Sequence, residues 1–469
     1  MAPKTKHLHR ISTVLALSTA LFLFGCVSES GEKSNSSDST GIIGAQKTEI
    51  TPPKNIIVFI GDGMGVTTLT AGRIFVGQEK GKLGEEHDLS WDRFNHLALI
   101  KTYNTNAQVP DSAGTATAIL SGYKTNIGAI NVRPDANLKK MLREGCGGDT
   151  VATLTDKAKS QGKSVGVIST ARLTHATPAA MFSHSASRSI EADKDLKGPF
   201  SYEGCKSIAQ QLIESEVDLA LGGGAKEFTQ DQLDNWTGVL AQTKAEMLTA
   251  RQDAPLLGLF TSSHMAFEAD RNDSQEPSLA QMTTFAIDRL SANQAGYVMM
   301  VEAGRIDHAH HGTNAYRALK DLQALDEAVA AAKSAVGDDT LILVTADHSH
   351  VLSIAGYPVR GNPILGLSRG VDPETGGPSD DYTLDGNGKP YTTLGYQNGP
   401  NTRQADAEVL TDNLVQARDY RQQTGVKLSS ETHAGEDVAL FADGPGAGRF
   451  GGVMEQDEIG QILGELLGQ

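Results

Sequence analysis

The sequence predicts an α/β fold: a three-layer α/β/α sandwich with a mostly parallel central sheet and a loop-rich insertion. Short runs rich in apolar and β-branched residues are typical of buried parallel strands. Helical patterns lie between these runs, and this alternation favours helices packed on both faces of a parallel sheet. A long segment dense in Gly, Pro, Asn and Asp predicts the insertion, at about residues 354–402.

Each expected element follows from its local pattern. The expected strands are NIIVFI (Asn55–Ile60), SVGVIS (Ser164–Ser169), DLALGG (Asp218–Gly223), YVMMV (Tyr297–Val301), TLILVT (Thr340–Thr345) and DVALFA (Asp437–Ala442). The expected helices are Asp149–Gln161, Ser207–Ser215, Ser278–Ala292, Asn314–Ala335 and Asp406–Gln422. In the longest of these, Leu319, Leu322 and Leu325 recur at helical spacing and predict one buried face.

The N-terminus has the character of an export signal. A positively charged start precedes an apolar stretch (Ile11–Phe24) that is shorter than the roughly 20 residues of a transmembrane helix. The stretch ends in LFGC (Leu23–Cys26), which resembles a lipobox with Cys26 as the lipidated first mature residue. Phe24 is larger than the residue usual before that glycine, so cleavage by an ordinary signal peptidase is the alternative.

The chain therefore divides into three segments. Residues 1–26 are expected to be a lipoprotein-type signal peptide, 27–50 a flexible tether rich in Ser, Gly and charge, and 51–469 the folded domain. Export predicts a periplasmic or cell-surface protein that contacts the membrane only through its lipid anchor. The oxidising compartment also predicts one disulfide between Cys146 and Cys205, with two unpaired thiols as the alternative.

The charge of the chain restricts its partners. The formal net charge is −16 at pH 7, and such an acidic surface repels nucleic acid and anionic lipid. We therefore expect no nucleic-acid partner. An anionic substrate would need local positive charge at its site, from metal ions or from arginine.

Polar side chains follow three of the predicted strands where each strand ends. They are Asp62, Glu302, Asp307, His311, Asp347 and His348. Because ligands of open α/β sheets bind beyond the carboxyl ends of the strands, these side chains should converge at one edge. Taken singly, each has an ordinary structural explanation; Asp62-Gly63, for example, is a common turn pair.

If these carboxylates converge as predicted, cations must neutralise their charge. Four carboxylates cannot share a small volume while ionised, because like charges raise one another's pKa. Mixed Asp and His ligands suit zinc, whereas ligands that are all oxygen suit magnesium. Asp307 and His311 are four residues apart, so one helical turn would place both on the same face.

A second feature is VPDSAGTATAILSG (Val109–Gly122), a loop that leads into a helical pattern. Ser112 would stand at the start of this helix. There it is either an ordinary N-cap or a group placed where the helix dipole and free N–H groups favour an anion.

At these residues the sequence resembles the alkaline phosphatases, as a bacterial chain with animal-type motif variants. The ordered motifs are FIGDGMG (Phe59–Gly65), VPDSAGTATA (Val109–Ala118), VEAGRIDHAHH (Val301–His311), TADHSH (Thr345–His350) and ETHAGEDVALFADGPGA (Glu431–Ala447). The resemblance runs from about Asn55 to the C-terminus and makes 51–469 a catalytic domain. It implies metal-dependent hydrolysis of phosphate monoesters to alcohol and inorganic phosphate through a phosphoserine intermediate, by a homodimer.

The resemblance also implies a role for each site residue. One zinc would be held by Asp307, His311 and His433, a second zinc by Asp62, Asp347 and His348, and a magnesium by Asp62, Glu302 and Thr177. Ser112 would be the nucleophile and Arg188 the clamp on the substrate phosphate.

Two positions depart from the best-known bacterial pattern. His175 stands where an aspartate is usual, near the magnesium, and His308 where a lysine is usual, near the phosphate. Both histidines occur in the animal enzymes, and they leave the identity of the third ion open. Cys146 and Cys205 lie where the animal-type enzymes have a disulfide.

Two rival functions remain open. Another member of the superfamily is one, although DSAGT (Asp111–Thr115) lacks the Pro and Arg that follow a sulfatase nucleophile, and phosphodiesterases lack a counterpart of Arg188. The other is a lipid-anchored surface protein with a dead site, which the full set of nucleophile, clamp and ligand residues argues against.

Overall fold

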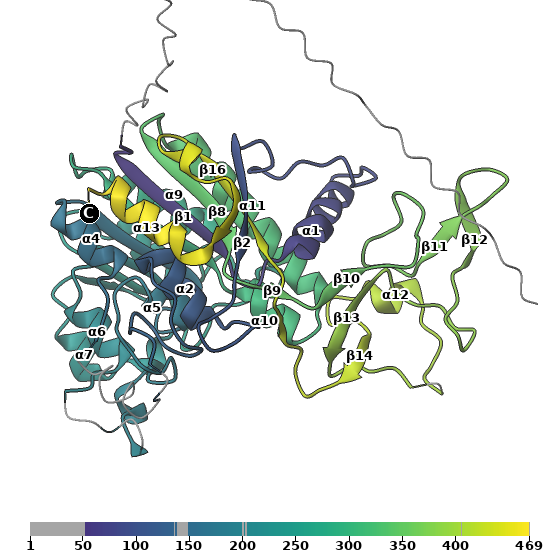
Figure 1. The fold of residues 1–469 in the computed structure, drawn as a ribbon, viewed down its shortest axis with the longest axis horizontal. Coiled ribbons are helices and arrows are strands. Elements are labelled where there is room, and N and C mark those ends of the chain that lie inside the picture. The colour runs from purple at the N-terminus through teal and green to yellow at the C-terminus, as the bar shows by residue number, and fades with distance from the viewer. Residues whose placement is uncertain are drawn as a thin grey trace, which may run out of the picture. The chain divides into compact units, whose positions relative to one another are not determined.

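One ten-stranded sheet organises the computed structural model, which describes residues 52–135, 137, 149–198, 201, 204–404 and 406–468 (Figure 1). In spatial order its strands are β17 (Gly452–Glu455), β2 (His96–Lys101), β16 (Val438–Asp443), β8 (Thr340–Ala346), β1 (Asn55–Gly61), β7 (Tyr297–Ala303), β3 (Ser164–Arg172), β4 (Leu219–Gly223), β6 (Leu256–Leu259) and β5 (Val239–Ala241).

The sheet is mostly parallel, as predicted. Strand β1 lies at its centre and pairs in parallel with β7 and β8. Strand β16 is antiparallel to both of its neighbours, β8 and β2, so it alone runs against the other strands of this sheet. The six predicted strands are therefore confirmed, but DVALFA does not run parallel to its neighbours as the others do.

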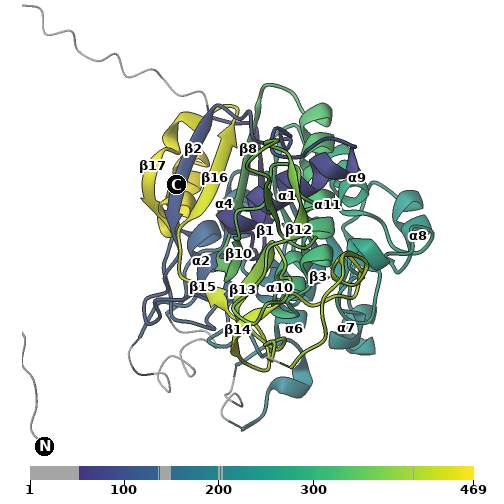
Figure 2. The same cartoon turned by 90° about the vertical axis from the view of Figure 1, so that its right-hand side faces the viewer.

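Helices cover both faces of this sheet, which confirms the three layers. Figure 2 shows α1, α9 and α11 on one side of the sheet and α2 and α4 on the other. The helices are α1 (Val66–Glu79), α2 (Ser112–Ser121), α4 (Leu154–Ser160), α5 (Ala176–Ala179), α6 (Ile208–Glu214), α7 (Gln230–Asp234), α8 (Lys244–Thr249), α9 (Leu279–Leu290), α10 (Arg305–His311), α11 (Ala315–Ala335), α12 (Asp412–Val415) and α13 (Gln456–Leu466). The predicted leucines of α11 are fully buried against this core.

Two predicted helices differ from the structure. The helix expected at 149–161 begins at Leu154, because Thr153 and Asp156 form a capping box there. The helix expected at 406–422 is wrong: only α12 is helical within it. Val409 and Leu414 are largely exposed, so this segment has no buried apolar face to stabilise a longer helix.

The predicted insertion lies within a longer excursion from the sheet, between β8 and β16. Its strands are β9 (Ser349–His350), β10 (Leu352–Ile354), β11 (Arg369–Val371), β12 (Pro378–Tyr382), β13 (Leu394–Gly399), β14 (Thr424–Lys427) and β15 (His433–Ala434). They form one three-stranded sheet and two two-stranded sheets beside the central sheet (Figure 1). The pair of β9 with β15 brings His433 opposite His350, at the base of the excursion.

Three predictions concern residues outside those described: the signal peptide, the tether and Cys146. Among the described helices, none has the length and hydropathy needed to cross a bilayer.

Helix α2, which carries Ser112, is held in place by a close backbone contact with α13. Gly122 ends α2 in the left-handed region (φ +85°), and Gly460 of α13 packs directly against it. A Cβ at Gly460 would lie 2.3 Å from the main-chain nitrogen of Gly122. This contact can be relieved only if the two helices move apart.

We expect Gly460→Ala to lower the free energy of unfolding by about 1–3 kcal/mol, because the added methyl group overpacks this contact. Urea unfolding would measure the change. Helix propensity alone predicts the opposite sign, a gain of up to about 1 kcal/mol. Gly451→Ala is the matched control, since a Cβ at Gly451 meets no atom within 4 Å. A Gly460→Ala protein as stable as the wild type would contradict the packing argument.

Candidate active site

The register of the central strands brings the predicted carboxylates to one edge. Gly61 of β1 is the register partner of Ala303 in β7 and of Ala346 in β8. Asp62 and Asp347 are the next residues on their strands, and α10 starts two residues after β7 ends. The sequence prediction of a shared carboxyl edge is therefore confirmed by the strand pairing.

Three side chains of this edge form a first group: Asp307, His311 and His433. The distance is 3.4 Å between His311 Nε2 and Asp307 Oδ1, 3.3 Å between His433 Nε2 and Asp307 Oδ1, and 3.2 Å between the two Nε2 atoms. A tetrahedral zinc site with ligand distances of about 2.0–2.2 Å has edges of about 3.3–3.6 Å. The spacing of the three atoms therefore fits a single ion.

The tautomers of both histidines support the same interpretation. His311 Nδ1 lies 2.7 Å from the carbonyl oxygen of Glu431, and His433 Nδ1 lies 2.8 Å from that of Pro110. A carbonyl only accepts, so each Nδ1 carries the proton and each Nε2 presents a lone pair. Two lone pairs and a carboxylate oxygen that face one another repel unless a cation lies between them.

A second group consists of Asp62, Asp347 and His348. His348 Nε2 lies 3.5 Å from Asp62 Oδ1, 3.4 Å from Asp347 Oδ2 and 3.2 Å from Ser112 Oγ. Its Nδ1 faces the carbonyl oxygen of Ser349 at 3.3 Å, so its Nε2 also presents a lone pair. The predicted nucleophile Ser112 therefore lies directly beside this second candidate ion site.

The two remaining predicted ligands, Thr177 and Glu302, lie outside these groups. Helix α5, which carries Thr177, packs against β3 and β7, and β7 carries Glu302. Thr177 Oγ1, Glu302 Oε1 and both carboxylate oxygens of Asp62 are buried and make no hydrogen bond within the described residues. Buried polar atoms are rarely left in this state, and a set made only of oxygens suits a hard ion such as magnesium.

The carboxylates interact strongly at this edge. Burial, followed by the charges of Asp347 and Asp307, raises the pKa of Asp62 well above its usual value. Burial also raises the pKa of Glu302 to about 7, against the opposing hydrogen bond that Ser169 donates to it. In the absence of cations, part of this site would therefore hold protons near neutral pH.

The pKa of Asp307 is lowered, not raised, because of its contact with His350, a residue that the sequence analysis did not predict. Burial alone would raise the pKa of Asp307, but the contact with His350 outweighs it, and that pKa is held well below its usual value. His350 Nε2 lies 2.7 Å from Asp307 Oδ1, and its Nδ1 lies 2.6 Å from Glu431 Oε2. With a carboxylate at each nitrogen, the pKa of His350 rises to about 10 against the cost of burial, so it is a charged partner of Asp307.

The predicted clamp Arg188 is fixed by a second residue that was not predicted, Asp111. Arg188 Nη1 donates to Asp111 Oδ2 at 3.1 Å, and Arg188 Nη2 donates to His175 Nε2 at 3.2 Å. The other oxygen of Asp111 caps α2 through the main-chain N–H of Gly114. One carboxylate therefore orients both the helix that begins at Ser112 and the guanidinium group.

His175 and His308 lie together with His264, which was also missed. Candidate ligand atoms of the three rings lie within 4.8 Å of one another. Burial lowers the pKa of His308 to about 3 and that of His264 to about 2, so both rings are neutral. His264 follows the end of β6, at the same edge of the sheet, and only the recognition of that short strand would have revealed it.

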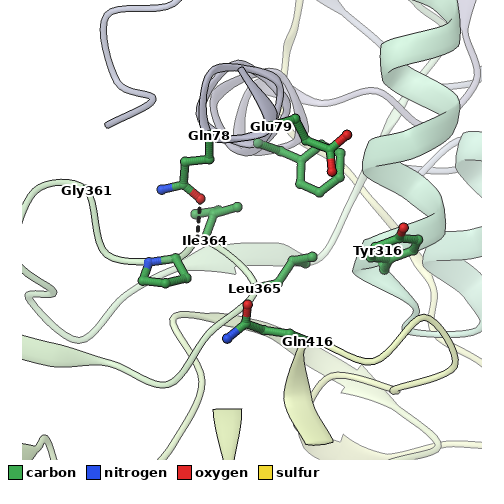
Figure 3. A pocket seen from close by; sticks show the side chains of 9 residues that line it. Gln78, Glu79, Tyr316, Gly361, Ile364, Leu365 and Gln416 are labelled. Carbon is green, nitrogen blue, oxygen red and sulfur yellow. Dashed lines mark hydrogen bonds between the residues drawn. The ribbon is translucent and has the colours of Figure 1, made fainter. Parts of the chain in front are cut away.

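A separate cavity of about 350 Å³ lies between α1, α11 and residues 361–365. Figure 3 shows Gln78 of α1 bound to Ile364, where the main-chain N–H donates to Gln78 Oε1 at 3.0 Å. Tyr316 and Leu365 also line it, but none of the predicted site residues does. This cavity is therefore distinct from the carboxylate and histidine groups.

Comparison with known proteins assigns the chain to one family. The family model described as "Alkaline phosphatase" matches residues 53–468. The tissue-nonspecific alkaline phosphatase of Felis catus is 39% identical over 455 residues, covering 89% of this chain and 84% of its own length. That of Gallus gallus is 41% identical over 447 residues, covering 87% and 83%.

Solved structures show the same fold. The alkaline phosphatase of the Antarctic bacterium TAB5 superposes with a TM-score of 0.61 at 23% identity, covering 90% of this chain and 99% of its own. The cold-active enzyme of Shewanella sp. gives a TM-score of 0.65 at 25% identity, covering 88% and 99%. On the family match and the identity to its relatives, the chain belongs to the alkaline phosphatase family.

Proposed function

We propose that this protein hydrolyses phosphate monoesters to an alcohol and inorganic phosphate, and that Ser112 is the residue that becomes phosphorylated. The observation that carries this proposal is the position of Ser112 Oγ, 3.2 Å from His348 Nε2 in a group with two buried carboxylates. Relatives about 40% identical over most of the chain carry the name alkaline phosphatase, which supports the reaction class.

The proposed ions are two Zn²⁺ and one Mg²⁺. The first zinc would be held by Asp307, His311 and His433, and the second by Asp62, Asp347 and His348, because mixed N and O ligands suit zinc. The all-oxygen set of Asp62, Thr177 and Glu302 would hold magnesium. A solved variant of the TAB5 relative is described with magnesium bound in its M3 site, which supports a third ion of this kind.

Two steps follow from the positions of the protein's own groups. Ser112 Oγ loses its proton and attacks phosphorus, so that a new P–O bond to serine forms, the ester P–O bond breaks, and the leaving oxygen takes up a proton and departs as the alcohol. Water then cleaves the phosphoserine and releases inorganic phosphate. Ser112 is the first residue of α2, where free N–H groups and the helix dipole favour the anionic substrate.

The remaining contribution is electrostatic. Arg188, already oriented by Asp111, would hold the phosphate oxygens through the planar fork of its guanidinium. Divalent ions bound at the two histidine-containing groups would stabilise negative charge on the attacking and leaving oxygens. Positioning and charge neutralisation are most of what phosphoryl transfer requires of a protein.

Several finer expectations stay predictions. They are export to the periplasm or cell surface, lipidation of Cys26, a disulfide between Cys146 and Cys205, and assembly as a homodimer.

The nucleophile can be tested directly. Ser112→Ala should lower kcat by about 10³-fold or more and should abolish the acid-stable phosphoenzyme, because it removes the hydroxyl that lies 3.2 Å from His348 Nε2. Acid quench of the holoenzyme with substrate, followed by mass spectrometry for one added phosphoryl group, would measure this. Ser334→Ala, on the exposed side of α11, is the control. Persistent labelling in the Ser112→Ala protein would show that another residue is the nucleophile.

The first ion site can be tested by metal content. Chelation should remove activity, and zinc with magnesium should restore it. His433→Ala should lose about one equivalent of zinc per chain, because one of three protein ligands is gone. His184→Ala is the matched control: His184 also bonds a carbonyl oxygen, that of Val151 at 2.8 Å, but belongs to neither group. Equal zinc content in both variants would refute the ligand assignment.

The carboxylate repulsion predicts a pH dependence of the metal-free protein. The pKa of Glu302 rises from 4.5 to about 7 on folding, so the folded state binds the extra proton. The contribution of Glu302 to the free energy of unfolding is complete below about pH 4.5. It is lost as the pH rises through 7, and the loss amounts to roughly 3 kcal/mol. Urea unfolding of the demetallated protein at several pH values would show this loss.

Glu302→Gln should remove that part of the pH dependence, because the amide does not titrate. Glu374→Gln, at an exposed turn, should leave it unchanged. The prediction fails if the wild type and Glu302→Gln lose stability in parallel between pH 4.5 and 7.

A further inference from the structure

The carboxylate of Asp111 receives hydrogen bonds from four separate places in the chain. Its Oδ2 accepts from Arg188 Nη1 at 3.1 Å. Its Oδ1 accepts from Asn104 Nδ2 at 3.1 Å and from the main-chain N–H groups of Gly114 at 3.2 Å and Gly128 at 2.9 Å. Asn104 is therefore the side chain that shares Asp111 with the proposed phosphate clamp.

Asn104 presents its amide from a fixed backbone. It lies in the loop after β2, and only 3% of it is exposed. Its main-chain N–H donates to the carbonyl oxygen of Ala107 at 3.0 Å, and the N–H of Ala107 donates back at 3.2 Å. The N–H of the next residue, Thr105, donates to the carbonyl oxygen of Thr125 at 3.0 Å. A donor held in this way restricts the orientation of the carboxylate that it contacts.

The approach of Asn104 to α2 depends on a glycine. Gly114 lies in the first turn of α2, and a Cβ at this position would lie 2.4 Å from Asn104 Nδ2. Glycine is unfavourable within a helix, because it loses more conformational freedom on folding than other residues do. The helix therefore gives up some intrinsic stability at the one place where the amide of Asn104 reaches Asp111.

The amide of Asn104 also lowers the stability of the fold. Its Nδ2 must face Asp111, because the amide oxygen would repel the carboxylate in that position. This orientation leaves Asn104 Oδ1 buried and without a hydrogen-bond partner among the described residues. A buried polar atom without a partner is destabilising. Packing alone does not explain such a residue, whereas a role at the site does.

We propose that Asn104 is a positioning residue for the phosphate clamp. Its N–H holds the carboxylate of Asp111 in the orientation that directs the guanidinium group of Arg188 to the substrate phosphate. Without this N–H, the guanidinium group is less well aligned and loses part of its paired contact with the phosphate oxygens. This inference rests on the proposed function and adds a residue that sets the phosphate affinity of the same site.

The test is the binding of inorganic phosphate to the zinc- and magnesium-loaded protein, measured by equilibrium dialysis with radiolabelled phosphate. Asn104→Ala should raise the Kd by about tenfold or more, because a hydrogen bond to a charged group is lost. Bound zinc should stay at the wild-type level, since Asp111 belongs to neither zinc-ligand group. Asn104→Asp keeps the size of the side chain but removes the donor, and it should raise the Kd at least as much.

Asn362→Ala is the matched control. Asn362 is also a buried asparagine, and its Nδ2 donates to the carbonyl oxygen of Leu367 at 3.2 Å, within the excursion. Its loss should lower stability and leave the Kd for phosphate unchanged.

A double-mutant cycle separates positioning through Asp111 from a general structural effect. In an Asp111→Asn protein, the further change Asn104→Ala should alter the Kd by less than about twofold, because the carboxylate through which it acts is already gone. A full tenfold effect in that background overturns the proposal.

An unchanged Kd in the Asn104→Ala or Asn104→Asp protein also overturns it, as does a loss of bound zinc from either variant, which would place the effect on the ions. A wild-type holoenzyme that neither binds phosphate nor hydrolyses a monoester overturns the proposed function itself. Normal hydrolysis by the wild type, together with an unchanged Kd in the variants, overturns the role of Asn104 alone.

Discussion

Four buried carboxylates lie at one edge of the central sheet, and the folded structure requires that their negative charge be compensated. Asp62, Glu302 and Asp347 are fully buried, and Asp307 is nearly so. The pKa values of three of them are raised, because burial and neighbouring carboxylates both oppose ionisation. A sheet edge that retains so many acids is stable in ionised form only with cations. One compensating charge comes from the chain, as the imidazolium of His350; divalent ions are the natural source of the rest.

The histidines differ in which ring nitrogen carries a proton, and this depends on the group that faces the nitrogen pointing away from the site. A carbonyl oxygen behind His311, His433 and His348 places the proton outward and the lone pair inward, as a metal ligand requires. Carboxylates at both nitrogens make His350 a cation. Behind His308 lies an arginine, Arg305, whose Nη1 is 3.0 Å from His308 Nδ1, so the lone pair is on Nδ1 and the proton on Nε2. Residue type alone therefore does not define the chemistry of this edge; the partner of the second ring nitrogen does.

The same distinction marks the limit of the sequence prediction. Asp62 and Asp347 could be placed because each directly follows a long apolar run, and strand ends of a parallel sheet share an edge. His264 follows only the four-residue strand β6, too short to recognise, and Asp111 acts through contacts with Arg188, 77 residues away. The helix expected at 406–422 failed because helix propensity without a buried face does not fix structure; Val409 and Leu414 are exposed there.

The excursion between β8 and β16 contributes residues to this site. It leaves the sheet just after Asp347 and His348 and returns at Glu431 and His433, so both of its ends contribute to the same charged centre. Pairing of His350 with His433 across β9 and β15 joins the ends by main-chain hydrogen bonds, and the contact of His350 with Glu431 adds an ion pair. An ion bound by both Asp307 and His433 would cross-link the base of this long loop to α10. Closing a long loop costs conformational entropy, and such a cross-link would offset that cost. Ion binding at this site would therefore be coupled to the order of the excursion.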